Sequence, residues 1–204
     1  MVQEQLARRD IRSPSVLEAM RSTPRHLFVA PEYRQNAYSD GPLPIGFGQT
    51  ISQPYIVALM TQLLALRGNE VVLEVGTGSG YQAAILGQMA REVHTIERHA
   101  GLARAAAHLL EQLQLNNIHV HIGDGSLGLP EFAPYQGILV TAAAPEVPPA
   151  LLEQLADGGR LVIPIGPRGC QILEVWQRHG AITEKRELIP VAFVPLIGEF
   201  GWED

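Results

Sequence analysis

Short apolar segments alternate with helical segments through the second two-thirds of the chain, and this alternation limits the possible folds more than any other feature. Buried strands are expected at 71–75, 92–97, 118–122, 137–142 and 160–165. Helices are expected between them, at 81–90, 101–115 and 148–156. Continuously apolar strands joined by helices are typical of a parallel sheet covered on both faces. The sequence therefore predicts a three-layer α/β fold with a mostly parallel central sheet.

The two ends of the chain depart from this pattern. After the last buried strand, residues 171–188 have the pattern of a hairpin and residues 190–198 that of a closing strand. We therefore expect antiparallel strands at the edge of the sheet. At the other end, Ser13 and Pro14 begin a helix, and residues 22–53 have no clean periodicity. A long irregular segment is usually functional in a compact domain, so we expect an N-terminal helical and irregular extension.

The composition argues against several classes of partner. The formal net charge is −6 and no more than two Lys or Arg are adjacent, so we expect no nucleic-acid partner. No uninterrupted apolar segment has the length of a membrane span, and Arg8, Arg9 and Arg12 stand where a secretory signal needs an apolar core. Cys170, the single cysteine, is expected as an apolar filler in a strand. These features favour the cytoplasm and no membrane partner.

The first strand of the alternating region leads into a glycine-rich loop. Residues 74–80 read Glu-Val-Gly-Thr-Gly-Ser-Gly and open a helix. Glycines at the carboxyl end of such a strand let the backbone turn sharply and approach a ligand closely. A dinucleotide fingerprint requires G-x-G-x-x-G, but its last position is Tyr81 here. The loop therefore predicts a nucleoside ligand without a pyrophosphate, and an NAD-dependent oxidoreductase is the weaker alternative.

Two acidic residues follow the next two strands, at positions that meet the same edge of the sheet. Glu97 closes the second strand, where a carboxylate can accept hydrogen bonds from both hydroxyls of a ribose. Asp124 follows the third strand, and Gly125 beside it leaves the backbone open to a flat base. Each feature alone has an ordinary explanation as a turn residue or a solvated charge. Three such features after three successive strands indicate one ligand site.

This arrangement resembles the class I S-adenosylmethionine-dependent methyltransferases, whose first motif is E/D-x-G-x-G-x-G with an acidic residue at the end of the second strand. The resemblance implies a Rossmann-like methyltransferase fold, S-adenosylmethionine as the cofactor and S-adenosylhomocysteine as the product. It also implies which residues bind the cofactor: Glu74, Gly76, Thr77, Gly78, Ser79, Gly80, Glu97, Asp124 and Gly125.

The sequence also bears on the methyl acceptor. Methyltransferases that act on exocyclic base nitrogens commonly carry Asp/Asn-Pro-Pro-Tyr after the fourth strand, where residues 141–145 read Thr-Ala-Ala-Ala-Pro. Cytosine-C5 enzymes use a Pro-Cys nucleophile, but Cys170 follows a glycine. Both nucleic-acid chemistries therefore lack their key residues, in agreement with the acidic net charge.

Segments spread over nearly the whole chain resemble the protein-L-isoaspartate (D-aspartate) O-methyltransferase family. The most specific is LPIGFGQTISQP at 43–54, since other methyltransferases do not share it. The resemblance implies that the α-carboxylate of L-isoaspartyl residues in damaged proteins and peptides is methylated, as the first step of repair, and it leaves open whether D-aspartyl residues are accepted. It assigns Ser52 to catalysis and the surrounding pocket to Thr50, Ile51, Gln53 and Val194.

Two details qualify this resemblance. Ser52 stands two residues before Pro54, so its hydroxyl could instead cap the helix that begins there, and the free N–H groups of a helix N-terminus attract a carboxylate. Ala192 departs from the family pattern, because many relatives have arginine before FVPL. We expect such a change to alter how the flanks of a peptide are held, without a required change in the catalytic core.

A chain of 204 residues fits one domain. We expect a single methyltransferase domain over 1–204, with N-terminal helices and a substrate-pocket segment in 1–66 and the cofactor-binding sheet and C-terminal strands in 67–204. A monomer is expected, and no metal, because His119 and His121 share a strand face without a third suitably spaced ligand. The alternatives are a methyltransferase for another protein or a small molecule, and a cofactor-binding module without catalysis.

Overall fold

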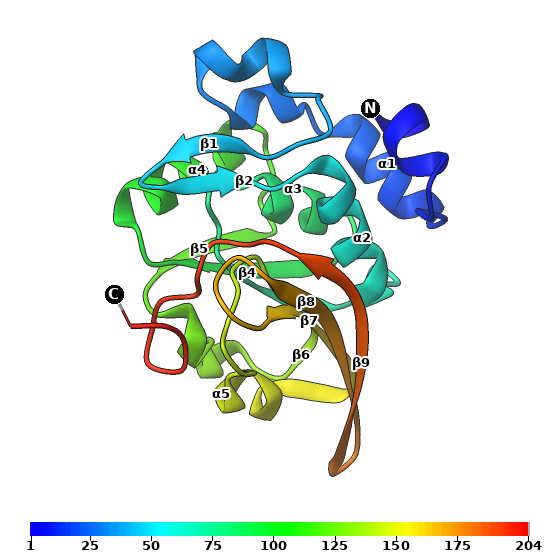
Figure 1. The fold of residues 1–204 in the computed structure, drawn as a ribbon, viewed down its shortest axis with the longest axis vertical. Helices are drawn as coiled ribbons and strands as arrows, with labels where there is room; N and C mark the ends of the chain where they lie inside the picture. Colours follow the sequence, from blue (N-terminus) through cyan, green and yellow to red (C-terminus); the bar gives the residue numbers. More distant parts are fainter. Residues whose placement is uncertain (204) are drawn as a thin grey trace.

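The computed structural model describes residues 1–203 and is built around a seven-stranded sheet (Figure 1). The strand order is β5-β4-β3-β6-β7-β8-β9. The first five strands in this order are parallel: β5 (Ile118–Ile122), β4 (Glu92–Glu97), β3 (Val71–Val75), β6 (Tyr135–Val140) and β7 (Leu155–Ile165). The prediction of a mostly parallel central sheet is confirmed.

A hairpin completes one edge of the sheet. Strand β8 (Gln171–His179) pairs antiparallel with β7 and with β9 (Ile182–Val191), so β8 runs against the parallel strands and β9 returns to their direction. The turn of the hairpin extends away from the rest of the molecule (Figure 1). The outermost strand carries Lys185, Arg186 and Glu187, and charged residues of this kind protect an edge strand from pairing with another chain.

Alternate residues of the parallel strands belong to two separate hydrophobic clusters. Val72 on β3 packs in one cluster and Leu73 in the other, and Leu139 and Ile138 on β6 divide in the same way. Because successive side chains of a strand point to opposite faces of the sheet, the two clusters lie on its two faces. Strands β3, β4 and β6 are therefore buried on both sides, as their apolar sequences predict. The expectation of a buried strand at 118–122 is wrong, because β5 lies at the edge of the sheet, none of its residues is buried and Ile122 is 54% exposed.

Helices cover both faces. The first cluster includes buried side chains from α1 (Pro14–Ser22), α2 (Pro54–Leu64), α3 (Tyr81–Gly87) and α4 (Ala100–Gln112). On the other face, α5 (Pro149–Glu153) buries Leu151 next to the short 3-10 helix η4 (Gly125–Leu127), and η5 (Pro130–Phe132) follows. Within residues 1–203, no helix combines the length and the apolar character needed to cross a membrane.

The start of α1 agrees with its sequence. The Ser13 hydroxyl accepts a hydrogen bond from the backbone N–H of Val16 at 3.4 Å, and Pro14 occupies the first helical position. A cap of this type contributes about 1 kcal/mol to helix stability. The hydroxyl of the cap and the fixed φ of proline both act within one turn, so this boundary could be predicted from sequence alone.

The irregular N-terminal segment contains short elements that sequence periodicity did not predict. They are the π-helix η1 (Val2–Ala7), the 3-10 helices η2 (Arg25–Phe28) and η3 (Pro31–Asn36), and a small antiparallel hairpin of β1 (Leu43–Gly46) and β2 (Gln49–Ile51). In Figure 1 the hairpin lies between the short helices η2 and η3 and the sheet, whereas α1 lies to one side, next to α2. A Cβ atom placed on Gly78 would lie 3.2 Å from Ile45, so the hairpin packs directly on the glycine-rich loop.

The predicted closing strand at 190–198 is wrong. Strand β9 continues to Val191, and the segment beyond it forms only isolated bridges. The Ala143 N–H donates to the Val194 carbonyl at 2.8 Å, and the Leu196 N–H donates to the Ala143 carbonyl at 2.8 Å. The segment therefore crosses the loop after β6 instead of joining the sheet, a tertiary arrangement that its apolar sequence does not reveal.

Two further expectations need correction. The predicted helix at 148–156 ends at Glu153, because Leu155 already belongs to β7. Cys170 is exposed in the turn before β8 and does not fill a strand interior.

Candidate active site

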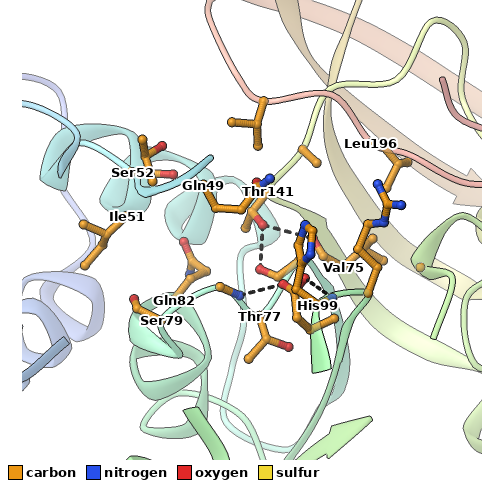
Figure 2. Close-up of a pocket in the computed structure, with 18 of the residues that line it drawn as sticks. Gln49, Ile51, Ser52, Val75, Thr77, Ser79, Gln82, His99, Thr141 and Leu196 are labelled. Carbon is orange, nitrogen blue, oxygen red and sulfur yellow. Dashed lines mark hydrogen bonds between the residues drawn. The ribbon is translucent and has the colours of Figure 1, made fainter. Parts of the chain in front are cut away.

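The strand order reverses between β3 and β6, because β4 lies on one side of this pair and β7 on the other. Open α/β sheets bind ligands at such a point, outside the carboxyl ends of the strands. A cavity lies there, with about 880 Å³ of empty space including its open mouth. The loop after β3, the ends of β4 and β6, segment 49–52 and residues 194–197 form its walls (Figure 2).

The glycine-rich loop presents backbone to this cavity. Gly76 has a φ of +96°, which side chains of L-residues rarely tolerate, and a Cβ atom there would lie 2.3 Å from Thr141 Oγ1. That hydroxyl donates to the carbonyls of Gly76 at 2.7 Å and Val75 at 3.1 Å. The end of β6 therefore holds the loop after β3 in place, and this close approach leaves no room for a side chain at position 76.

The Glu97 carboxylate lies at the cavity wall and is held by two backbone N–H groups. One oxygen accepts from Gly78 at 3.0 Å and the other from His99 at 2.9 Å (Figure 2). A carboxylate has about four positions for accepting hydrogen bonds, so about two remain for a ligand. The His99 ring stacks on Phe47, with 5.4 Å between ring centroids, so the turn of the β1–β2 hairpin closes over this side of the site.

A second cavity adjoins the first. Both are lined by Thr50, Ser52, Thr141 and Val194, which therefore form a junction between them. The remaining walls of the second cavity are mostly apolar and come from Pro42, Ile56 and residues 190–193, together with Gln53. A group bound in the second cavity would thus face a ligand bound in the first.

The alternative role of Ser52, as the cap of α2, is wrong. The residue at the cap position is Gln53, and no side chain completes this cap. Among residues 1–203, none forms a hydrogen bond with the Ser52 hydroxyl, which lines both cavities. The Ser52 carbonyl accepts from Arg25 Nη2 at 2.8 Å. The backbone of Ser52 is therefore fixed while its hydroxyl stays available to a ligand.

Most of the predicted site residues line the first cavity. They are Thr50, Ile51, Ser52, Gly76, Thr77, Gly78, Ser79, Glu97, Gly125 and Val194. Gln53 lines only the second cavity, and Gly80 packs against Ala106 on α4. Asp124 accepts from the N–H and hydroxyl of Ser126, at 2.9 and 2.7 Å, and from the Glu199 N–H at 2.8 Å, so it organises the loop next to Gly125. Direct contact of each predicted residue with a cofactor or substrate stays a prediction, including that of Gly80, Asp124 and the buried Glu74.

Comparison with known proteins agrees with this geometry. Residues 1–201 match the model of the family described as protein-L-isoaspartate(D-aspartate) O-methyltransferase. The protein-L-isoaspartate O-methyltransferase of Methanoregula boonei is 54% identical over 204 residues, which cover all of this chain and 94% of that protein. Protein-L-isoaspartate O-methyltransferase 1 of Syntrophobacter fumaroxidans is 53% identical over 203 residues, covering 100% of this chain and 95% of that protein. The chain belongs to this family.

Solved structures support the same assignment. A protein-L-isoaspartate O-methyltransferase structure superposes with a TM-score of 0.88 and 27% identity, covering 98% of this chain and 67% of that one. A Plasmodium falciparum protein described as an isoaspartate methyltransferase, solved with S-adenosylhomocysteine, gives a TM-score of 0.84 and 26% identity over 96% of both chains. The Rossmann-like methyltransferase fold and the S-adenosylmethionine cofactor are thereby confirmed.

The first cavity fits this cofactor on its own geometry. The backbone of Gly76 and Gly78 lines the cavity, so a ligand can approach the loop closely. Glu97 retains acceptor positions suited to the two ribose hydroxyls. The neutral backbone and hydroxyl groups of Thr77 and Ser79 suit a nucleoside without phosphates. Glu97 and the glycine-rich loop would therefore hold the nucleoside part of the cofactor.

Sequence reasoning missed several residues of the candidate site. Thr141, His99, Gln82 and Gln49 all line the first cavity. Thr141 follows β6 and His99 follows β4, so their positions at the carboxyl ends of strands could have identified them. Gln82 lies in the first turn of α3, and its amide donates to the Thr61 hydroxyl at 2.9 Å. That contact with α2 depends on tertiary packing and leaves no signal in the sequence.

Glu74 supports the glycine-rich loop from beneath. Its carboxyl group is fully buried and accepts a hydrogen bond from the Thr95 hydroxyl, which lies 2.7 Å from the Thr77 hydroxyl. The other carboxyl oxygen has no hydrogen-bond partner among residues 1–203. Burial raises the pKa of Glu74 to about 8, the Thr95 hydrogen bond opposes this rise, and the Glu97 charge adds to it. Glu74, the acidic residue of the glycine-rich motif, is thus connected to the cavity through Thr95 and Thr77.

This raised pKa predicts a pH-dependent stability. Between pH 5 and 8 the folded protein keeps a proton on Glu74 that the unfolded chain releases, so the free energy of unfolding falls as pH rises. The loss is about 1.4 kcal/mol per pH unit, or roughly 4 kcal/mol across this window. Glu74→Gln keeps the shape without the proton and should remove this slope. Urea denaturation at several pH values measures it, with the exposed Glu184→Gln as control. Parallel profiles for wild type and Glu74→Gln would contradict the prediction.

Proposed function

We propose that methyl transfer takes place at the junction of the two cavities, with the cofactor in the first and an isoaspartyl residue in the second. The observation that carries this proposal is the wall that both cavities share, formed by Thr50, Ser52, Thr141 and Val194. The activity is that of the family: the methyl group of S-adenosylmethionine is transferred to the free α-carboxylate of L-isoaspartyl residues in proteins and peptides. The products are a methyl ester and S-adenosylhomocysteine.

The acceptor carboxylate needs no general base. Its ordinary pKa is near 4, so it is already anionic at neutral pH. When bound, the cofactor supplies a methyl group on a positively charged sulfur, and this is the electrophile of the reaction. The chain has to hold oxygen, carbon and sulfur in line at near-attack distance and to exclude water. Positioning therefore dominates catalysis at this site.

Ser52 orients the carboxylate in this proposal. Negative charge on the attacking oxygen disappears during methyl transfer, so a hydrogen bond to that oxygen would stabilise the ground state more than the transition state. The Ser52 hydroxyl is therefore proposed to donate to the other carboxylate oxygen and to leave the attacking oxygen free. Its availability, without a hydrogen bond to any of residues 1–203, supports this role.

The second cavity suits a peptide that carries a reacting carboxylate. Ile56, Val191 and Phe193 line it with apolar surface, which removes water from the carboxylate. Two opposite charges cancel in the reaction, and a drier site favours that change. Ala192 lines the same cavity, so the departure from the family arginine falls on the wall proposed to contact residues flanking the isoaspartyl group.

A pair of peptides tests the proposed activity. They have the same sequence and differ only in containing L-isoaspartate or normal L-aspartate. With methyl-labelled S-adenosylmethionine, we expect base-labile methyl ester on the isoaspartyl peptide alone, since only that residue exposes its α-carboxylate on a side branch. A third peptide with D-aspartate measures whether the site also accepts that residue.

A cytoplasmic location and a monomeric state stay predictions from the sequence.

The opposite result has a clear meaning. Label on neither peptide, with cofactor binding confirmed by calorimetry, would remove the isoaspartyl assignment and favour a small-molecule acceptor. Equal label on the isoaspartyl and aspartyl peptides would mean that the second cavity does not distinguish the two backbones.

A further inference from the structure

Arg25 is fully buried at the start of η2 and contacts three separate parts of the chain. Its Nε donates to the Ala37 carbonyl at 2.7 Å, and its Nη2 donates to the Ser52 carbonyl at 2.8 Å. The guanidinium carbon lies 4.8 Å from the centroid of the Tyr81 ring. One side chain therefore joins the irregular N-terminal segment, the substrate-pocket segment and the first turn of α3.

The charge of Arg25 has no partner of opposite sign in the described part of the chain. Among residues 1–203, no carboxylate lies within ion-pair distance of its guanidinium, and Nη1 is buried without a hydrogen-bond partner. Burial lowers the pKa of Arg25 and the neighbouring Tyr81 raises it, but a guanidinium stays protonated at neutral pH. Burying a cation without a counter-ion is unfavourable for folding. The buried position of Arg25 is therefore better explained by the groups that it holds in place than by a contribution to folding stability.

The two groups beside the guanidinium belong to the two halves of the site. Tyr81 begins α3 directly after the glycine-rich loop, lines the first cavity and is 1% exposed. Its ring also packs edge-on against Phe28, with 5.4 Å between ring centroids, which fixes its position. Ser52, on the other side, lies at the junction of the cavities. Arg25 itself lines neither cavity, so it can act only through these neighbours.

We propose that Arg25 is a positioning residue that fixes the distance between Ser52 and the cofactor cavity. It does so by binding the Ser52 carbonyl on one side and the face of the Tyr81 ring on the other. The inference rests on the role proposed for Ser52. In-line transfer is sensitive to placement, since a misplacement of about 1 Å can reduce a rate roughly 100-fold. Releasing the Ser52 carbonyl should therefore reduce kcat by a larger factor than it reduces the affinity for the cofactor.

Three variants test this inference by steady-state kinetics. Arg25→Met removes every donor but keeps an unbranched side chain, and Arg25→Lys keeps a cation. Thr23→Val is the matched control, because Thr23 is also buried, donates to the Ala19 carbonyl at 2.8 Å and lies outside both cavities. We expect kcat on an isoaspartyl peptide to fall about 10- to 100-fold in Arg25→Met and less in Arg25→Lys. Thr23→Val should lower the melting temperature and leave kcat unchanged. In all three variants the affinity for S-adenosylhomocysteine should change only a few-fold.

Amide hydrogen exchange gives a second readout that needs no substrate. Exchange over residues 43–54 should become faster in Arg25→Met and stay as in wild type in Thr23→Val. If Arg25→Met does not fold, the same comparison is made with Arg25→Lys. Unchanged kcat together with unchanged exchange over 43–54 would overturn the inference. A wild type inactive on isoaspartyl peptides would instead contradict the proposed function, and the exchange comparison would still decide whether Arg25 positions this segment.

Discussion

Replacing Gly76 with alanine is expected to raise the dissociation constant of S-adenosylhomocysteine by about 100-fold or more. The added Cβ atom would lie 2.3 Å from Thr141 Oγ1, far inside van der Waals contact. The φ of +96° adds strain of about 1–2 kcal/mol for a residue with a side chain. Thr141 cannot move without breaking its hydrogen bonds to the carbonyls of Val75 and Gly76, so the loop itself must shift. Isothermal titration calorimetry measures the affinity.

Two further variants separate crowding from backbone strain. Gly158 also has a positive φ, +75°, but a Cβ atom there would meet nothing within 4 Å. Gly158→Ala should lower stability slightly and leave the affinity unchanged. Adding Thr141→Ala to Gly76→Ala removes the hydroxyl in the way and should restore part of the affinity. Wild-type affinity in Gly76→Ala would show that the loop after β3 does not form the cofactor wall.

Replacing Ser52 with alanine is expected to reduce kcat/KM for an isoaspartyl peptide about 100-fold while cofactor affinity stays near wild type. The hydroxyl lines both cavities and carries no hydrogen bond to residues 1–203, so its removal leaves no buried partner unsatisfied. The variant should therefore lose kcat/KM because the carboxylate is poorly oriented, while its melting temperature changes little. Steady-state kinetics on the isoaspartyl peptide, calorimetry with S-adenosylhomocysteine and a melting curve give the three quantities.

Ser39→Ala serves as the control for this experiment, because Ser39 lies exposed in the same irregular segment and lines neither cavity. It should match wild type in all three measurements. If Ser52→Ala lost cofactor affinity and kept its turnover at saturating cofactor, Ser52 would belong to the cofactor site and its proposed role toward the carboxylate would fail.

Features that act over a few residues were determined by the sequence alone. The Ser13 cap, the continuously apolar strands and the glycine-rich loop depend on contacts within one turn or on side-chain alternation. The parallel sheet follows from these patterns, because strands buried on both faces must be covered by the helices that join them. The carboxyl ends of these strands then meet at one edge, so the sequence also predicted where Gly76 and Glu97 would meet.

Only the tertiary structure decided how the second half of the site is assembled. Ser52 does not cap α2, and its backbone is held by Arg25 from a distant segment. Thr141 holds Gly76 across two strands, and residues 194–196 cross the loop after β6 instead of forming a strand. Each of these contacts joins segments far apart in the chain and ends on a backbone carbonyl, which every residue offers. Such contacts leave no periodic pattern, so their partners become visible only after the sheet has brought the segments together.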